Sequence, residues 1–212
     1  MNTLAHWGPA LQFIVELLAT AAFALSGIMK ASRKGLDAVG VCVVGFLAAF
    51  GGGTLRDLLL DQRPFFWVRH VDVLWGVLAL CVLAMAFMRQ SHFQLTEKAI
   101  QWPDALGLGL FTAAGVSQAL ALELPGMVAV IMGVITGVFG GVLRDIVCNE
   151  IPAAFSDHRP YAVCALVGGW TDVGLSTLGV PGWVAMGACV AVTAGMRGLA
   201  LWQDWQLPAW RP

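Results

Sequence analysis

Long apolar stretches separated by short polar segments run through the whole chain. A helix that crosses a bilayer needs about 20 mainly apolar residues, because each residue rises ~1.5 Å across ~30 Å of hydrocarbon. The stretches are apolar at consecutive positions, whereas a strand of a membrane β-barrel alternates apolar and polar residues. We therefore predict an all-α polytopic membrane protein with seven transmembrane helices, at residues 9–29, 36–60, 70–88, 104–122, 125–148, 160–178 and 183–202.

The composition agrees with this pattern. Of the 212 residues, 58% are hydrophobic and only 12% are charged, against roughly 25% charged residues in a soluble domain. So few charges could not cover that much apolar surface in water, so we expect a single membrane domain over residues 1–212 in contact with lipid. The net charge of −1 and the lack of a long basic run argue against a nucleic-acid partner.

The distribution of Lys and Arg predicts the orientation in the membrane. Cytoplasmic loops carry an excess of these residues. Eight of them fall on one side of the predicted spans and two, Arg63 and Arg69, on the other. We therefore expect the N-terminus outside and the C-terminus in the cytoplasm, with these residues inside: Lys30, Arg33, Lys34, Arg89, Lys98, Arg159, Arg197 and Arg211.

A shift of 88 residues aligns the first half of the chain with the second. Residues 52–57, Gly-Gly-Thr-Leu-Arg-Asp, fall on residues 140–145, Gly-Gly-Val-Leu-Arg-Asp. We predict two three-helix repeats, at 9–88 and 104–178, followed by a final helix at 183–202. Because each repeat has an odd number of spans, the second is inverted in the membrane, a pattern common in secondary transporters. The same shift aligns Phe23 with Phe111, Gly27 with Gly115 and Gly45 with Gly133.

Four ionisable residues lie deep in the predicted spans, namely Arg56, Asp57, Arg144 and Asp145. A charge at a helix centre costs about 2.5–3.5 kcal/mol on insertion scales, so such residues face a partner or a water-filled cavity. Neighbouring helix residues point about 100° apart, so we expect no easy pairing of Arg56 with Asp57. Pairing between the two repeats is an alternative, and the four residues are either structural ion pairs or the lining of an ion pathway.

Glycines precede both Arg-Asp pairs, at Gly51, Gly52 and Gly53 and at Gly140 and Gly141. Each glycine weakens a helix by about 1 kcal/mol relative to Ala, so we predict kinked or broken helices there. The glycines have two possible roles. They permit close helix crossings, or they expose backbone carbonyls that coordinate a cation where the break lines a cavity.

Hydroxyl and basic residues add to the candidate set. Ser26 and Thr54 lie near the same level, where each either lines the pathway or bonds back to its own helix. The cluster of Lys30, Arg33 and Lys34 is a topology signal, and anionic lipid head groups are an alternative partner for it.

No enzyme chemistry is indicated. The five cysteines show no C-x-x-C spacing, so we expect packing residues rather than metal ligands. The four histidines show no metalloprotease spacing, and no pair of nucleophile and base suggests itself. We therefore expect no catalytic residues, no bound metal and no cofactor.

Four segments together resemble the prokaryotic TRIC family, the trimeric intracellular cation channel homologues, whose bacterial members are also described by a glycine transporter domain that occurs twice per chain. These are Phe-Ala-Leu-Ser-Gly at 23–27, Gly-Gly-Gly-Thr-Leu-Arg-Asp at 51–57, Gly-Gly-Val-Leu-Arg-Asp at 140–145 and Cys-Asn-Glu-Ile-Pro at 148–152. The resemblance covers nearly the whole chain. It implies a protein of the cell inner membrane that forms a homotrimer with one pore in each subunit.

The resemblance also implies conduction of monovalent cations, chiefly potassium (or sodium), past the kinks of the second and fifth helices. One departure is that Phe139 stands opposite Gly51. Two alternatives are a carrier of glycine or another small solute that uses the same site by alternating access, and a membrane scaffold without transport. The candidate pathway residues are Ser26, Gly51, Gly52, Gly53, Thr54, Arg56, Asp57, Gly140, Gly141, Arg144 and Asp145.

Overall fold

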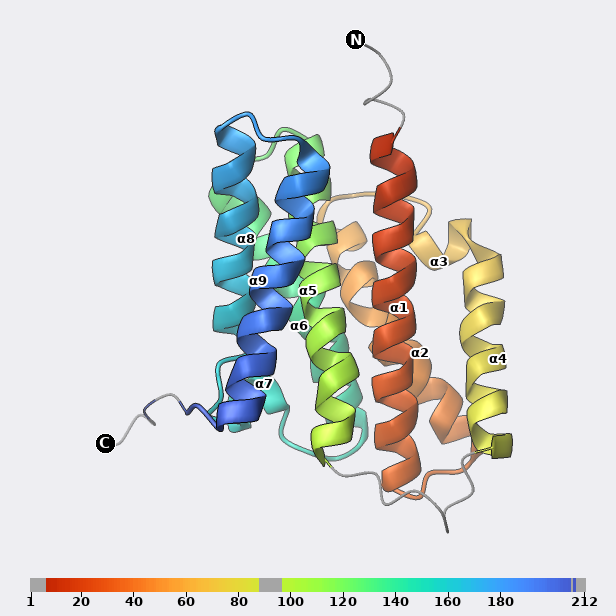
Figure 1. The fold of residues 1–212 in the computed structure, drawn as a ribbon. Coiled ribbons are helices and arrows are strands. Elements are labelled where there is room, and N and C mark those ends of the chain that lie inside the picture. The colour runs from red at the N-terminus through yellow and green to blue at the C-terminus, as the bar shows by residue number, and fades with distance from the viewer. Residues whose placement is uncertain (1–6, 88–96, 207, 209–212) are drawn as a thin grey trace.

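A computed structural model of the protein describes residues 7–87, 97–206 and 208. Within these residues the chain forms a bundle of long helices, with two short helices at its ends (Figure 1). The helices are α1 (Trp7–Arg33), α2 (Ala38–Leu59), α3 (Phe66–Arg69), α4 (Val71–Phe87), α5 (Glu97–Ala121), α6 (Gly126–Val147), α7 (Ala153–Ser156), α8 (Ala162–Thr177) and α9 (Gly182–Gln203).

Each of the seven predicted stretches coincides with a long helix. Four helical segments in the described residues are long and apolar enough to cross a membrane, namely Ala10–Arg33 of α1 and the whole of α2, α6 and α9, while α4 is apolar but shorter. Large apolar side chains cover the outside of the bundle. Phe87, Leu178 and Trp202 are 80%, 79% and 76% exposed, which suits a lipid environment rather than water.

The helices that carry the glycine runs are not interrupted. Both α2 and α6 continue through their glycines as single helices of 22 residues, so the prediction of broken helices is wrong. The glycines lie where α2 crosses α6. A methyl group on Gly52 would meet the backbone carbonyl of Thr136, and one on Gly140 would meet that of Ala48. The absence of side chains therefore allows the two backbones to touch.

The two halves of the chain also share their turns. Gly35 and Glu123, 88 residues apart, both adopt a positive φ, of 67° and 58°. Asp61 and Asn149 do the same just after α2 and α6, at 51° and 55°. A left-handed residue at this position ends a helix by turning the chain back on its last carbonyls.

Packing inside the two halves follows the same correspondence. Gly27 of α1 lies against Gly45 of α2, and Gly115 of α5 lies against Gly133 of α6. The rings of Phe23 and Phe111, which the 88-residue shift aligns, contact each other with centroids 5.5 Å apart. Helices α1 and α5 lie near each other and run in opposite directions (Figure 1).

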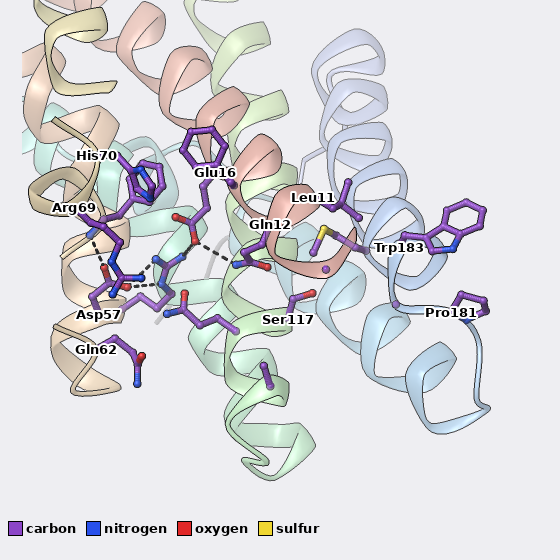
Figure 2. A pocket seen from close by; sticks show the side chains of 18 of the residues that line it. Leu11, Gln12, Glu16, Asp57, Gln62, Arg69, His70, Ser117, Pro181 and Trp183 are labelled. Carbon is purple, nitrogen blue, oxygen red and sulfur yellow. Dashed lines mark hydrogen bonds and ion pairs between the residues drawn. The ribbon is translucent and has the colours of Figure 1, made fainter. Parts of the chain in front are cut away.

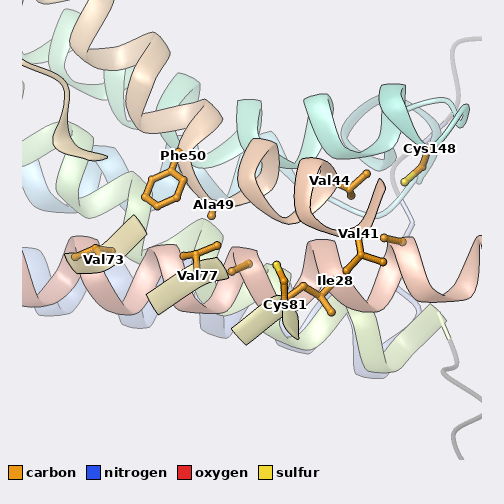
Figure 3. Close-up of a cluster of buried hydrophobic side chains, with 11 residues drawn as sticks. Ile28, Val41, Val44, Ala49, Phe50, Val73, Val77, Cys81 and Cys148 are labelled. Atoms are coloured by element: carbon orange, nitrogen blue, oxygen red, sulfur yellow. The ribbon is translucent and has the colours of Figure 1, made fainter. Parts of the chain in front are cut away.

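Buried apolar side chains fill the spaces between the helices. One cluster joins α1, α2, α4 and the end of α6 through residues such as Ile28, Val44, Val77 and Cys148 (Figure 3). Cys81, Cys148, Cys164 and Cys189 are all buried and free. They pack as small apolar residues, as the sequence predicts.

Candidate functional site

A buried charged group stands near one end of the bundle, and we call it the Arg56 cluster (Glu16, Arg56 and Asp57). Arg56 Nη1 donates to Glu16 Oε1 of α1 at 2.9 Å. Its Nε and Nη2 atoms donate to Asp57 Oδ1 at 2.9 and 2.7 Å. The three residues are at most 5% exposed. One guanidinium therefore faces two carboxylates, which leaves an excess negative charge.

A second group has the same plan, and we call it the Arg144 cluster (Asp104, Arg144 and Asp145). Arg144 Nη1 pairs with Asp104 Oδ1 of α5, and its Nε donates to Asp145 Oδ1 at 2.9 Å. The 88-residue shift takes Glu16, Arg56 and Asp57 onto these three residues. The ion pairs are thus duplicated along with the helices.

The pairing of neighbouring residues corrects a prediction. Arg56 does bind Asp57, and Arg144 does bind Asp145, although the two Cβ atoms of each pair leave the helix in different directions. The arginine side chain is long enough to fold along the helix surface, so its forked guanidinium reaches the adjacent carboxylate. Pairing of an Arg of one repeat with an Asp of the other is also wrong, because each guanidinium binds the acids of its own half.

The second oxygen of each aspartate holds the short helix that follows. Asp57 Oδ2 accepts a hydrogen bond from the backbone N–H of Phe66, the first residue of α3, at 3.1 Å. Asp145 Oδ2 accepts one from Ala153, the first residue of α7, at 2.9 Å. Backbone N–H groups at a helix start have no partner within the helix. Each aspartate therefore links its arginine to the neighbouring short helix.

The Arg56 cluster opens into a pocket of about 870 Å³. Residues of α1, α2, α3, α5 and α9 line it, and Figure 2 shows Glu16, Asp57, Arg69 and His70 on one side of it, with Ser117 and Trp183 farther across. The wall toward α9 is apolar and includes Trp183. The pocket therefore has a polar side, where the cluster and Arg69 lie, and an apolar side toward α9.

The Arg144 cluster is closed in by further side chains. Tyr161 donates its hydroxyl to Asp104 Oδ2 at 2.7 Å, and Arg144 Nη1 donates to Ser26 Oγ at 2.5 Å. The guanidinium of Arg197 lies over the Tyr161 ring, 4.9 Å from the ring centroid. Arg197 is 1% exposed and binds Asp157 at 2.9 Å. Helix α9 is thereby tied to this cluster.

Two lysines, one in the last turn of α1 and one just after it, also meet the Arg144 side of the bundle. Lys30 Nζ pairs with Glu150 and lies 3.8 Å from Asp145 Oδ1, and Lys34 Nζ lies 2.6 Å from Glu150 Oε1. Burial acts to raise the pKa of Glu150, but the hydrogen bonds from both ammonium groups outweigh it and lower the pKa to about 2. Lys30 is 7% exposed, so the prediction that it contacts lipid head groups is wrong, while Arg33 and Lys34 are exposed.

The remaining candidate residues lie either beside the arginine clusters or at the crossing of α2 and α6, and Thr54 bonds within its own half. Gly53 and Gly141 face their own clusters, because a methyl group there would lie 3.9 Å from Arg56 Nη2 and 3.6 Å from Arg144 Nη2. Gly51 lies against Leu143 across the helix crossing. Thr54 bonds back to the carbonyl of Phe50 at 2.8 Å and accepts from Trp67 of α3, so its hydroxyl serves its own half.

Sequence reasoning missed several residues of these clusters. Glu16 and Asp104 are 88 residues apart and both acidic. The repeat therefore indicates them when chemically similar residues, and not only identical ones, are aligned. Tyr161 and Glu150 carried no such signal, because the aligned residues are Val73 and Gln62. Among the described residues there is no group of three or more His, Cys, Asp or Glu side chains that could hold a metal ion.

Comparison with known proteins gives the family. The family model described as "Glycine transporter" matches residues 13–89 and 101–177, so the second match begins and ends 88 residues after the first. The UPF0126 inner membrane protein YadS of Escherichia coli K12 is 38% identical over 159 residues, which cover 75% of this chain and 76% of that protein. A UPF0126 membrane protein of Vibrio cholerae is 37% identical over 160 residues, 76% of this chain and 66% of that protein.

A solved structure shares the fold over almost its whole length. The TRIC trimeric intracellular cation channel orthologue from Rhodobacter sphaeroides matches with a TM-score of 0.85 and 32% identity, covering 92% of this chain and 99% of that chain. This protein is a helical membrane protein, and the solved structure that it resembles is a cation channel. The chain therefore belongs to the family described as "Glycine transporter", the family of the prokaryotic TRIC proteins.

Proposed function

We propose that the chain is a channel for monovalent cations, with potassium the principal ion and a pathway through each subunit. The pathway would run from the pocket past the Arg56 cluster, along the crossing of α2 and α6, and past the Arg144 cluster. The relationship to a solved cation channel supports this assignment. The sequence resemblance implies potassium as the chief permeant ion, and sodium is the alternative ion.

The charge of the Arg56 cluster is the observation that carries the proposal. Each buried guanidinium is bound by two carboxylates. At the Arg144 end Lys30, 3.8 Å from Asp145 Oδ1, supplies a further positive charge, whereas the Arg56 cluster keeps one carboxylate in excess beside the pocket. A buried excess charge needs a compensating counter-ion. A cation that enters from the pocket would meet the carboxylates of Glu16 and Asp57 in an environment that water only partly screens.

The pathway requires a definite arrangement in the membrane. We propose that α1, α2, α4, α5, α6, α8 and α9 all cross it, as two inverted repeats of three spans followed by a final span. The antiparallel course of α1 and α5 and the duplicated clusters support the inversion. With the N-terminus outside the inner membrane, the pocket faces outward and Lys30, Lys34 and Glu150 face the cytoplasm. Three such subunits would form the homotrimer.

The same clusters bear on a carrier of glycine or another small zwitterion, which the family description names. A zwitterion needs a cationic group for its carboxylate as well as an acid for its amine. Arg56 and Arg144 are already engaged by two acids each, so a zwitterion in the pocket would have to place its carboxylate at Arg69, the other cation of the pocket wall.

The experiment that tests the proposal is reconstitution of the purified protein in liposomes and planar bilayers. We expect discrete potassium currents, and no saturable uptake of radiolabelled glycine. Glu16→Gln should reduce the current, because it removes negative charge from the wall of the pocket. Its matched control is Gln62→Ala, which shortens another pocket residue without changing charge. Saturable glycine uptake without currents would contradict the channel and support the carrier. The absence of both signals would support a membrane scaffold without transport.

A further inference from the structure

Lys30 joins the two halves of the chain at the cytoplasmic side of the Arg144 cluster. It belongs to α1, yet its ammonium group pairs with Glu150 after α6 and lies 3.8 Å from Asp145 Oδ1. Lys34, just after the end of α1, binds the other oxygen of Glu150 at 2.6 Å. Ser26, one turn before Lys30, contacts Arg144. Lys30 therefore stands between the Arg144 cluster and the end of the bundle.

The first half of the chain lacks this arrangement. The 88-residue shift takes Lys30 onto Gln118 and Glu150 onto Gln62, so both charged partners become neutral amides. Gln118 and Gln62 line the pocket beside Arg56 and Asp57. The Oε1 atom of Gln118 is buried and has no hydrogen-bond partner in the described part of the chain. Where one half holds an ion pair, the other half thus holds an open cavity.

We propose that the Lys30 ammonium group, held by Glu150 and Asp145, is a tethered cation that closes the pathway at its Arg144 end. Gln118 at the corresponding position leaves the Arg56 end open to the pocket. This inference rests on the proposed function, because it assigns the closing element of that same pathway. A bound ammonium group neutralises the carboxylates that a mobile cation would use and repels that cation at short range.

The geometry makes Lys30 the closing group and Lys34 its support. Lys30 is 7% exposed and lies close to an acid of the cluster itself, whereas Lys34 is exposed and its ammonium group pairs with Glu150. Lys34 therefore fixes the carboxylate to which Lys30 is bound. Opening requires the Lys30 side chain to leave Glu150 and Asp145.

A swap between the two halves tests the inference. Lys30→Gln gives the second half the residue of the first, and Gln118→Lys does the reverse. We expect Lys30→Gln to raise potassium flux into liposomes about tenfold and Gln118→Lys to lower it by a similar factor, within the range of coupling that one ionic contact supplies. Lys30→Arg keeps the ion pair and should behave like the unaltered protein.

A second measurement does not depend on conduction. With the five native cysteines replaced by Ala, Ser26→Cys places a thiol one turn behind Lys30. A small cationic methanethiosulfonate reagent added from the cytoplasmic side should label this introduced thiol slowly, and about tenfold faster after Lys30→Gln. When Gln118→Lys is added to Lys30→Gln, labelling should stay fast while the flux falls. Size-exclusion profiles and thermal unfolding check that each variant is folded, and Glu150→Gln replaces Lys30→Gln if the latter is not.

The outcomes separate this inference from the proposed function. Equal labelling rates with and without Lys30, in folded protein, would overturn the tethered cation. Fast labelling after Lys30→Gln without potassium flux in any variant would uphold the closure and contradict the channel. Flux that rises as much with Lys30→Arg, which keeps the positive charge, as with Lys30→Gln would show that the ammonium charge does not close the pathway, and would likewise overturn it.

Discussion

Gly52 and Gly140 occupy the same position on two crossing helices, and each lies against a backbone carbonyl of the other helix. The carbonyl that faces Gly52 belongs to Thr136, four residues before Gly140, and the one that faces Gly140 belongs to Ala48, four residues before Gly52. The contact is therefore symmetric in the two halves. It sets the distance between α2 and α6 and, with it, the separation of the two arginine clusters.

A methyl group at either glycine should separate the helices. Gly52→Ala and Gly140→Ala each place a Cβ atom against backbone that cannot move aside, and overpacking of this kind costs about 1–3 kcal/mol. We expect a lower midpoint of thermal unfolding in detergent for both. Gly76→Ala in α4 is the control, because its Cβ would meet nothing within 4 Å of this chain. Equal midpoints for Gly52→Ala and Gly76→Ala would show that the crossing is not tightly packed.

Replacing Arg56 should lower the free energy of unfolding more than replacing Glu16. Arg56→Gln leaves Glu16 and Asp57 as buried carboxylates without their cation, and an uncompensated buried charge costs about 3–5 kcal/mol. Glu16→Gln leaves Arg56 paired with Asp57, so its effect on stability should be smaller. Chemical denaturation in detergent compares the two variants. If Glu16→Gln proved the more destabilising, then Glu16 rather than Asp57 would be the main partner of the guanidinium.

The fold could be predicted largely because lipid imposes simple rules on sequence. All seven predicted stretches coincide with helices. The repeat aligns Phe23 with Phe111, and the rings of these two residues are in contact in the structure. The predictions that were wrong depended on the length of a side chain or on the packing of one helix against another. The angular rule for neighbouring helix residues ignores the length of arginine, so the bond between Arg56 and Asp57 was not expected.

The same limits explain the glycines and Lys30. Helix propensity predicted a break at Gly52, but a helix without side chains on one face gains contact with its neighbour, and that gain keeps α2 intact. The sequence indicates Lys30 as part of a basic cluster that marks the topology, with anionic lipid head groups as an alternative partner. Its partner Glu150 lies 120 residues away, and no local pattern indicates such a contact.

Tyr161 should hold the Arg144 cluster in place. Tyr161→Phe removes the hydrogen bond to Asp104 and leaves a buried carboxylate oxygen without that partner, at a cost of about 1–3 kcal/mol. We expect a lower unfolding midpoint, with Trp67→Phe, which removes the hydrogen bond to the partly buried Thr54, as a milder comparison. An unchanged midpoint for Tyr161→Phe would mean that water replaces the hydroxyl group at Asp104.

The ion pair of Glu150 should persist in acid. Its pKa in the folded protein is about 2, against 4.5 ordinarily, so the stability that it contributes is complete above the ordinary pKa and is lost as the pH falls through about 2. At about pH 3.5, where an exposed glutamate is largely protonated, Glu150 should still be ionised. Carboxyl carbon NMR of glutamate-labelled protein can follow this titration, with Glu150→Gln to assign the signal.

Each ammonium group should account for part of this low pKa. In Lys30→Gln the carboxylate keeps Lys34 but loses one charged donor, so its titration midpoint should rise toward 4.5, the ordinary value. Lys34→Gln should raise it as well, and the double variant should raise it furthest, because burial then acts without compensation. A midpoint that stays near 2 in the double variant would show that neither lysine holds Glu150 ionised, and the contact would then have no role in closing this end of the bundle.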